Sequence, residues 1–292
     1  MRIIVIGGGI SGLSAAHRLV ELSSGRNLPI DVILLEASQR LGGVISTRHV
    51  DGFLIEEGPD SFITTKPAVL NLCRRIGLDS QLIQTNSTYR RTFVVHRGRL
   101  LSIPEGFLML APARFLPFLI SPLFSWRGKF RMLLDLVLPR AKGLTDESLA
   151  SFVTRRLGRE ALDRVAQPLI SGVYTADPEK LSLRATMPRF LEMEEESGSV
   201  IRAMIHEQNR AEKRQSGARY SMFMSFKEGM KTLVDALAGR LSGGSVRLNE
   251  GVRRVELTQK GWNVITDKDL ELQADGIIIT IPAYQAAAIV EG

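Results

Sequence analysis

Cysteine and histidine are scarce in this sequence, and they form no recognisable cluster. The 292 residues include one cysteine, Cys73, and four histidines. A single cysteine excludes a framework of disulfide bonds and suggests a reducing compartment. Cys73 ends the apolar stretch Leu70-Asn71-Leu72-Cys73, so we expect it to be buried and inert. Because the histidines are scattered, no metal-ligand spacing arises, and we expect no metal.

Signals of several other protein classes are also missing. No Gly-x-Ser-x-Gly elbow is present, so nothing supports an esterase. No charged and then apolar leader precedes the first residues, so we expect a cytoplasmic protein. The apolar segment 104–138 is interrupted by Pro112, Pro117 and Pro122, which break any helix that would span a membrane. We expect short helices there, which line an apolar cavity or lie on the surface of a bilayer.

The excess positive charge is concentrated in one segment. Lysine and arginine number 38, aspartate and glutamate 31, which gives a formal net charge of +7. One acid, Glu105, lies between positions 90 and 131. The basic residues of this segment are Arg90, Arg91, Arg97, Arg99, Arg114, Arg127, Lys129 and Arg131. They form a solvated face, a surface for anionic lipid, or a cationic lining for an anionic substrate. We expect no nucleic-acid partner, because no recognition motif accompanies the charge.

The N-terminal stretch carries the pattern of a dinucleotide-binding turn. The apolar run Ile3-Ile4-Val5-Ile6 is followed by Gly7, Gly9 and Gly12. In such a turn the first glycine permits a tight bend, the second lets the backbone approach a pyrophosphate, and the third lets the next helix pack against the strand. The helix expected over residues 12–21 would direct its free N–H groups at the phosphates.

A carboxylate and a second glycine turn follow this motif. Glu36 ends the apolar run 31–35, where it can accept a hydrogen bond from a ribose hydroxyl. The first glycine motif alone does not separate NAD from FAD. The Gly42-Gly43 pair beside Arg40 resembles the corresponding turn of FAD-binding flavoproteins of the amine-oxidase type.

Turn signals outline the remaining elements. A hairpin is expected at residues 48–56, turning at Asp51-Gly52, and another at 93–101, turning at Arg97-Gly98. Helices are expected at residues 67–76 and 145–157. Short strands that suit a β-meander are expected at residues 245–248, 252–257, 262–266 and 277–281.

Longer stretches resemble one family. The two glycine turns with Glu36, together with the loop Glu56-Glu57-Gly58-Pro59-Asp60-Ser61, resemble FAD-dependent protoporphyrinogen and coproporphyrinogen oxidases. Residues 98–106 and 168–182 narrow the resemblance, because the second of these stretches is hard to match in general amine oxidases. The resemblance runs over the whole chain, and the bacterial branch that acts on coproporphyrinogen III looks closest.

The resemblance implies an α/β fold. Residues 1–90 and 220–292 would form a Rossmann-like FAD-binding domain of the amine-oxidase type. Residues 91–219 would form an inserted, mainly helical domain that faces the substrate or a membrane. Family members continue beyond this length, so the chain resembles the N-terminal portion of such an enzyme. A catalytically incomplete fragment is therefore one alternative, and a related amine oxidase or carotenoid desaturase is another.

The resemblance also implies site residues. The cofactor-binding residues would be Gly7, Gly9, Ile10, Ser11, Gly12, Glu36, Ala37, Arg40, Gly42, Gly43, Gly58, Pro59, Asp60 and Val252. The substrate-binding residues would be Arg91, Arg90, Lys66 and Gly172. Arg91 is displaced by one residue from the family's cation, which directly precedes the strand at Phe93. No side chain stands out as a general base.

The implied reaction is the oxidation of coproporphyrinogen III, or of protoporphyrinogen IX, to the porphyrin in haem biosynthesis. FAD would take the electrons in two-electron steps, while the protein supplies position and field. Oxygen would reoxidise the flavin and give hydrogen peroxide. Peripheral contact with a membrane and handover of the product to a ferrochelatase are left open by the resemblance.

Overall fold

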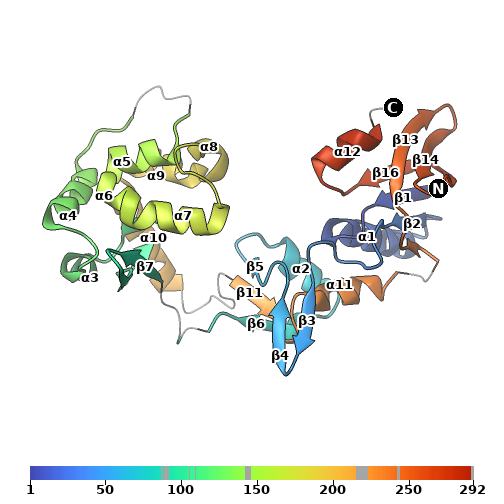
Figure 1. The fold of residues 1–292 in the computed structure, drawn as a ribbon, viewed down its shortest axis with the longest axis horizontal. Helices are drawn as coiled ribbons and strands as arrows, with labels where there is room; N and C mark the ends of the chain where they lie inside the picture. The colour runs from blue at the N-terminus through green and yellow to red at the C-terminus, as the bar shows by residue number, and fades with distance from the viewer. Residues whose placement is uncertain are drawn as a thin grey trace. The chain divides into compact units, whose positions relative to one another are not determined.

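The computed structural model describes residues 1–86, 88, 92–104, 106–108, 110–141, 146–214, 223–241 and 244–290 (Figure 1). The chain divides into two compact units, which we call the first unit (Met1–Thr85 with Tyr220–Gly292) and the helical unit (Asn86–Arg219). That these units carry the roles expected of residues 1–90 with 220–292, and of residues 91–219, stays a prediction.

The first unit combines helices with parallel and antiparallel strands. Its helices are α1 (Ile10–Arg26), α2 (Ala68–Arg75), the 3-10 turn η1 (Asp79–Gln81), α11 (Lys231–Ala238) and α12 (Ala283–Val290). Its strands are β1 (Arg2–Ile6), β2 (Asp31–Leu35), β3 (Thr47–Val50), β4 (Phe53–Glu56), β5 (Phe62–Ile63), β6 (Leu82–Gln84), β11 (Phe223–Phe226), β12 (Val246–Arg247), β13 (Val252–Thr258), β14 (Gly261–Thr266), β15 (Glu271–Ala274) and β16 (Gly276–Ile279).

A parallel sheet with the strand order β12-β2-β1-β16 is the centre of the first unit. Ile4 of β1 pairs with Ile33 of β2 on one side and with Ile277 of β16 on the other. The near-continuous apolar runs of β1 and β2 are typical of parallel strands that are buried on both faces. The predicted α/β fold is thus observed.

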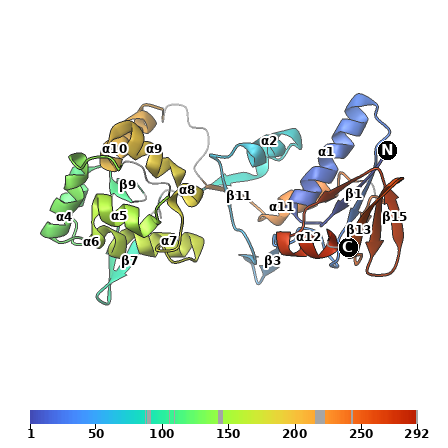
Figure 2. The ribbon, with the colours of Figure 1, turned by 90° about the horizontal axis from the view of Figure 1, so that it is seen from above.

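The two faces of this sheet are covered by different elements. Val5, Val32 and Leu34 pack toward α1 and α11, which lie against each other (Figure 2). Ile4 and Ile6 point the opposite way, into a core shared with the β13–β15 sheet and α12. The alternation of successive strand residues between two cores places the ends of β1 and β2 between these layers.

The predicted β-meander is only partly correct. β13 and β14 pair antiparallel, as expected, and β15, a strand that the sequence analysis did not predict, extends them to a three-stranded antiparallel sheet. β12 and β16, however, pair in parallel with β2 and β1. Their apolar residues are buried by non-local partners, which a local alternation pattern does not specify.

Both predicted hairpins are observed. β3 and β4 pair about Asp51 and Gly52, whose φ angles are 51° and 81°. In the helical unit the hairpin of β7 (Phe93–His96) and β8 (Arg99–Ser102) turns at Arg97 and Gly98. These turn residues adopt the left-handed conformation that two-residue hairpin turns require.

The helical unit surrounds one large apolar core. Its further elements are β9 (Phe107–Leu108), β10 (Ala111–Pro112), α3 (Phe115–Ile120), α4 (Trp126–Leu133), η3 (Leu134–Leu136), α5 (Leu149–Leu157), α6 (Arg159–Ala161), the π-helical turn η4 (Leu162–Ala166), α7 (Gln167–Tyr174), α8 (Leu183–Thr186), α9 (Pro188–Ser197) and α10 (Val200–Arg214). In the part of the chain that the structure describes, no helix is both long and apolar enough to cross a bilayer.

A buried ion pair joins the helices of this unit. The fully buried Arg156 of α5 donates through Nε to the Asp135 carboxylate at 2.6 Å. Asp135 also accepts hydrogen bonds from the Ser199 hydroxyl and the Ile201 amide. Arg156 donates further to the Gly198 carbonyl. Both charges are therefore satisfied inside the core, as buried charges must be.

Candidate functional site

A cavity of about 830 Å³ lies at the carboxyl ends of β1 and β2, wholly within the first unit. Five segments that are distant in sequence form its walls. The lining residues are Ile6, Gly7, Gly9, Ile10, Ser11, Leu35, Glu36, Ala37, Ser38, Gly42, Gly43, Val44, Glu250, Gly251, Val252, Thr280, Ile281, Pro282, Gln285, Ala288 and Ile289. In open parallel sheets this edge is the usual place for a ligand. We call this cavity the cradle.

Each glycine of the β1–α1 turn is explained by a different structural feature. Gly7 has a φ of 107°, which side chains of L residues rarely adopt. A methyl group on Gly12 would overlap the Gly7 carbonyl oxygen, so only glycine allows this approach of α1 to the strand. At Gly9 the nearest atom to such a methyl group is the Gly43 Cα, at 4.0 Å. The protein therefore leaves the space at Gly9 open toward the cradle.

The N-terminus of α1 offers unused amide donors to this space. The first backbone hydrogen bond of the helix runs from the Leu13 N–H to the Gly9 carbonyl, at 2.9 Å. The preceding N–H groups of Ile10 and Ser11 belong to the first turn, and N–H groups of a first turn have no acceptor within the helix. No side chain caps this end, and its first turn contains no acidic residue. Free amides and the positive end of the helix dipole suit an anion such as a pyrophosphate.

Glu36 is held rigidly at the end of β2. One carboxylate oxygen accepts the Gly8 N–H at 2.6 Å, and the other accepts the Ser38 N–H at 2.8 Å. Each oxygen keeps a further acceptor site, because a carboxylate offers about four. The half-buried carboxylate lines the cradle and can therefore accept hydrogen bonds from sugar hydroxyls.

Arg40 holds the second glycine turn in place. Its guanidinium donates to the carbonyls of Gly43 at 2.7 Å, Ile45 at 3.1 Å and Leu41 at 3.3 Å. Arg40 is not among the residues that line the cradle. In this structure the side chain fixes a loop beside the predicted cofactor site, and its predicted direct contact with the cofactor stays untested.

The C-terminal part of the first unit supplies a wall that sequence reasoning missed. Thr280 follows β16, and its hydroxyl donates to the carbonyl of Ile6 at 2.8 Å, with a second contact to that of Gly7 at 3.1 Å. Ile281 and Pro282 continue along the same wall. The apolar run at 277–279 was the available signal, but its pairing with β1 could not be seen from local alternation.

The predicted cofactor residues are divided between the cradle and its surroundings. The predicted residues that line it are Gly7, Gly9, Ile10, Ser11, Glu36, Ala37, Gly42, Gly43 and Val252. Gly12, Arg40, Gly58, Pro59 and Asp60 lie outside the lining. A side chain on Gly58 would overlap the Val44 carbonyl, so Gly58 serves close packing of its loop against a cradle residue.

The predicted substrate residues are not brought together by the described structure. Arg90 and Arg91 lie outside the described residues. Lys66 is exposed in the turn before α2. Gly172 is exposed on α7, and nothing lies within 4 Å of a methyl group placed there. Their role in binding a substrate stays a prediction.

The basic segment 90–131 is not one cationic surface. Lys129 is only 5% exposed, donates to the Leu119 carbonyl at 2.6 Å and lies over the Trp126 ring. Arg131 donates to the carbonyls of residues 154, 155 and 156 at the end of α5. The prediction that the basic residues of this segment face solvent, lipid or a substrate is therefore wrong for Lys129 and Arg131.

Cys73 is buried in the core of the first unit, as expected. Burial, with a smaller contribution from the Asp79 charge, raises the pKa of its thiol to about 11. The thiolate is the reactive form of cysteine, so a thiol with this pKa is unreactive near neutral pH.

The residues of the cradle fit an adenine dinucleotide. The glycine backbone and the free amide donors suit the pyrophosphate, and the fixed carboxylate suits the ribose. Val252, Ile281 and Ala288 offer apolar contact to the rest of the dinucleotide. The acidic residues in the lining are Glu36 and Glu250, and the latter bonds through its amide to the Glu36 carbonyl. The lining contains no histidine, lysine or cysteine. A dinucleotide held there would supply the redox chemistry.

Comparison with known proteins agrees with this fit. A model of the family described as flavin-containing amine oxidoreductase matches residues 10–290. Coproporphyrinogen III oxidase of Bacillus subtilis (strain 168) is 34% identical over 98% of this chain. Protoporphyrinogen oxidase 1, chloroplastic, of Arabidopsis thaliana is 32% identical over 98% of this chain. A crystal structure from Exiguobacterium sp. 255-15, provisionally named a protoporphyrinogen oxidase, superposes with a TM-score of 0.80 at 30% identity over 99% of this chain.

The chain spans about half to three fifths of the length of these relatives. It covers 61% of the Bacillus protein, 53% of the Arabidopsis protein and 61% of the Exiguobacterium chain. The family match confirms the predicted amine-oxidase type of fold, in a family described as flavin-containing.

Proposed function

The chain belongs to the flavin-containing amine oxidoreductase family, and we propose that it takes part in the FAD-dependent oxidation of a porphyrinogen in haem biosynthesis. The observation that carries the proposal is the cradle, which combines free helix amides, open space at Gly9 and the fixed carboxylate of Glu36. Names of relatives at 34% and 32% identity support a porphyrinogen as the substrate. We favour coproporphyrinogen III over protoporphyrinogen IX.

Each part of the cradle has a distinct task in holding FAD. The Ile10 and Ser11 amides donate to the pyrophosphate, and the open space at Gly9 admits it. Glu36 accepts hydrogen bonds from the ribose hydroxyls. Arg40 keeps the Gly42-Gly43 loop against the β1–α1 turn, where Gly42 donates to the Gly8 carbonyl at 2.8 Å. Bound FAD supplies the acceptor for a pair of electrons, and the protein supplies position and field.

The electron balance of the reaction sets how many equivalents of an electron acceptor are needed. A porphyrinogen loses three pairs of electrons and the accompanying protons when it becomes a porphyrin. We propose oxygen as the final acceptor, with one hydrogen peroxide formed for each pair. The propionates of the substrate are anionic, so cations would bind them. Arg91, Arg90 and Lys66 are the candidates, and Gly172 would leave room for the macrocycle.

We also propose peripheral contact with a membrane through α3 and α4. Leu116, Ile120, Trp126 and Phe130 are exposed on these two helices, and Arg127 lies among them. Exposed apolar side chains beside a cation suit an anionic bilayer surface. The protein would be cytoplasmic and would hand its product to a ferrochelatase. Flotation with phosphatidylglycerol vesicles tests the contact, and a Trp126→Ser, Phe130→Ser variant should no longer float.

Titration of the full chain with FAD tests the proposal directly. We expect saturable binding, followed by conversion of coproporphyrinogen III to a red-fluorescent porphyrin with release of peroxide. Initial rates on protoporphyrinogen IX decide between the two substrates. Peroxide release from polyamines without porphyrin formation would instead indicate an amine oxidase. Failure to bind FAD would contradict the role of the cradle, and it would favour the alternative that this chain is catalytically incomplete.

A further inference from the structure

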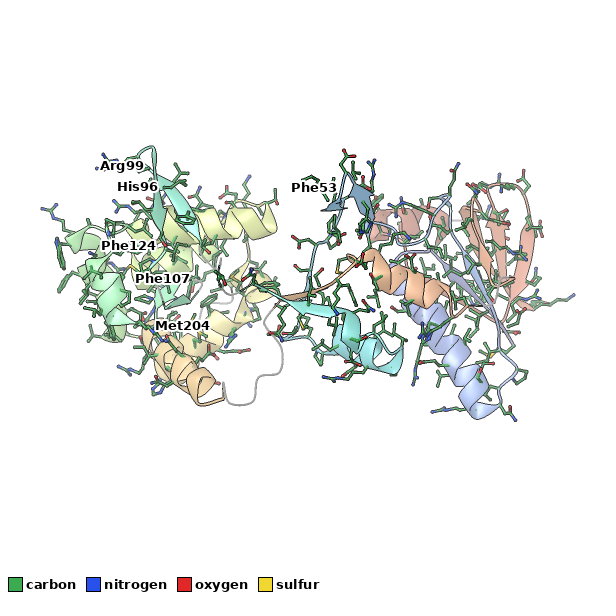
Figure 3. All side chains as sticks on the ribbon, turned by 90° about the horizontal axis from the view of Figure 1, so that it is seen from below. Phe53, His96, Arg99, Phe107, Phe124 and Met204 are labelled. Carbon is green, nitrogen blue, oxygen red and sulfur yellow. The ribbon has the colours of Figure 1, made fainter. Side chains whose placement is uncertain are left out.

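The helical unit contains a second cavity, of about 610 Å³, beside the β7–β8 hairpin. Its lining residues are His96, Arg97, Arg99, Leu101, Pro122, Phe124, Ser125 and Arg164. We call it the hairpin groove. Figure 3 shows His96 and Arg99 close together near the turn of the hairpin, with Phe124 deeper in the unit. The groove lies wholly within the helical unit, so it does not depend on the cradle.

The register of the hairpin explains why cations line the groove. His96 pairs directly with Arg99, and Val94 pairs with Leu101. Because strand residues two apart share a face, these four side chains lie on the same face of the hairpin. Val94 is buried in the core of the unit, and Leu101 packs against that core. His96 and Arg99 therefore continue the inward face beyond the core, toward the turn.

The opposite face of the hairpin is apolar and exposed. Phe93, Val95 and Leu100 are 51%, 70% and 69% exposed. A solvated hairpin normally turns its apolar residues inward and its polar residues outward. Here the polar side chains of His96 and Arg99 occupy the inward face. Arg99 is exposed there and His96 is half-buried, so both side chains are accessible to a ligand in the groove.

Of the three arginines that line the groove, only Arg164 has an anionic partner among the described residues. Arg164 forms an ion pair with Glu160, and its Nη1 also donates to the Leu123 carbonyl. Among the described residues, the guanidinium groups of Arg97 and Arg99 have no ion pair and no hydrogen bond. Within the described part of the chain the lining itself holds no carboxylate, and the nearby Glu160 carboxylate is bonded to Ser125 and Arg164. Two guanidinium charges thus remain for a ligand, above a floor formed by Leu101, Pro122 and Phe124.

We propose that the hairpin groove binds a small molecule in which a phosphate or carboxylate group is carried on an apolar body. The forked guanidinium groups of Arg97 and Arg99 match the geometry of such oxyanions. Two positive charges balance a phosphate monoester, which carries about −1.5 to −2 at neutral pH. The apolar floor takes the body of the ligand, and the oxyanion lies at the turn of the hairpin.

Calorimetric titration of the full chain with 1-naphthyl phosphate tests this site. We expect saturable binding that is tighter than that of inorganic phosphate, because the floor adds apolar contact. Replacing both Arg97 and Arg99 by glutamine should weaken it at least tenfold. Arg127→Gln is the matched control, since Arg127 is an exposed arginine of the same unit outside the groove lining. That variant should change the affinity less than twofold.

Three outcomes would overturn the proposal. One is the absence of saturable binding to the unmodified chain. The second is an equal loss in Arg127→Gln and in the Arg97→Gln, Arg99→Gln variant, which would mean attraction by net charge alone. The third is binding to phosphatidylglycerol vesicles that needs Arg97 and Arg99 while 1-naphthyl phosphate does not bind, which would assign the arginines to a lipid surface. Circular dichroism of both variants checks that the fold is retained.

Discussion

Gly9 and Gly12 lie in one turn, yet a methyl group at each should have opposite consequences. At Gly9 the methyl group has open space within the protein, and its nearest neighbour is the Gly43 Cα at 4.0 Å. The Gly9 backbone, with φ −71° and ψ −178°, is accessible to alanine. Gly9→Ala should therefore keep the fold, whereas its methyl group projects into the cradle. We expect FAD affinity to fall at least tenfold, or about 1.4 kcal/mol.

Gly12→Ala should act on stability instead. The new methyl group overlaps the Gly7 carbonyl and comes within 2.8 Å of the Thr280 hydroxyl oxygen, so α1 must move away from β1. Overpacking costs about 1–3 kcal/mol, and the backbone overlap favours the upper end. Alanine regains up to about 1 kcal/mol of helix propensity. A net loss of about 2 kcal/mol lowers the melting temperature by roughly 4–8 °C.

Two measurements on each variant separate these effects. Thermal unfolding followed by circular dichroism reports stability without FAD, and calorimetric titration with FAD reports affinity. Gly52→Ala is a control away from the cradle, at a glycine with nothing within 4 Å of the added methyl group but a φ of 81°. Gly52→Ala should be less stable than the unmodified chain, but the folded variant should bind FAD with unchanged affinity. If Gly9→Ala bound FAD as tightly as the unmodified chain, the dinucleotide would not lie against this turn.

Three further changes test other parts of the structure. Glu36→Gln places an amide NH₂ group against the N–H of Gly8 or of Ser38, which should lower stability by about 1–3 kcal/mol. FAD affinity should fall about tenfold, or about 1.4 kcal/mol. Unchanged affinity in calorimetric titration would refute the contact with the ribose. Arg156→Leu leaves the Asp135 carboxylate buried without its cation, which should cost about 3–5 kcal/mol in thermal unfolding. The pKa of the Cys73 thiol is raised from 9.0 to about 11, so it should resist a thiol reagent at pH 8 until the protein unfolds. Because the unfolded thiol loses its proton first, stability should fall between pH 9 and about 11 relative to Cys73→Ala, and an equal slope in both proteins would contradict this.

Local pattern was sufficient for the β1–α1 turn and both hairpins. The glycines after β1 and the acid after β2 are fixed by short-range geometry, because a tight turn and a close approach of helix to strand permit few residues. The turns at Asp51-Gly52 and Arg97-Gly98 follow from the left-handed conformation that hairpins need. These features could therefore be predicted from residues that lie next to each other in the sequence.

Direction of a side chain and pairing of distant strands could not be predicted in this way. Arg40 was predicted to contact the cofactor, which stays untested, and its hydrogen bonds to three carbonyls of its own loop could not be read from the spacing. Lys129 and Arg131 counted as surface charge, although one is buried and the other caps α5. Sequence spacing gives the location of a cation in the chain, whereas its partner depends on tertiary packing.

The wall at Thr280 shows how the cradle depends on the whole first unit. β1 and β16 are adjacent in the sheet although the entire helical unit lies between them in the sequence. The Thr280 hydroxyl then bonds to the carbonyls of Ile6 and Gly7, the residues that enter the glycine turn. The N-terminal motif thus supplies the groups that suit a dinucleotide, while Thr280, directly after β16, holds the turn in shape. Thr280→Val, which removes the hydroxyl and keeps the size, should accordingly weaken FAD binding without a residue of the motif being changed. Unaltered affinity in that variant would show that the turn keeps its shape unaided.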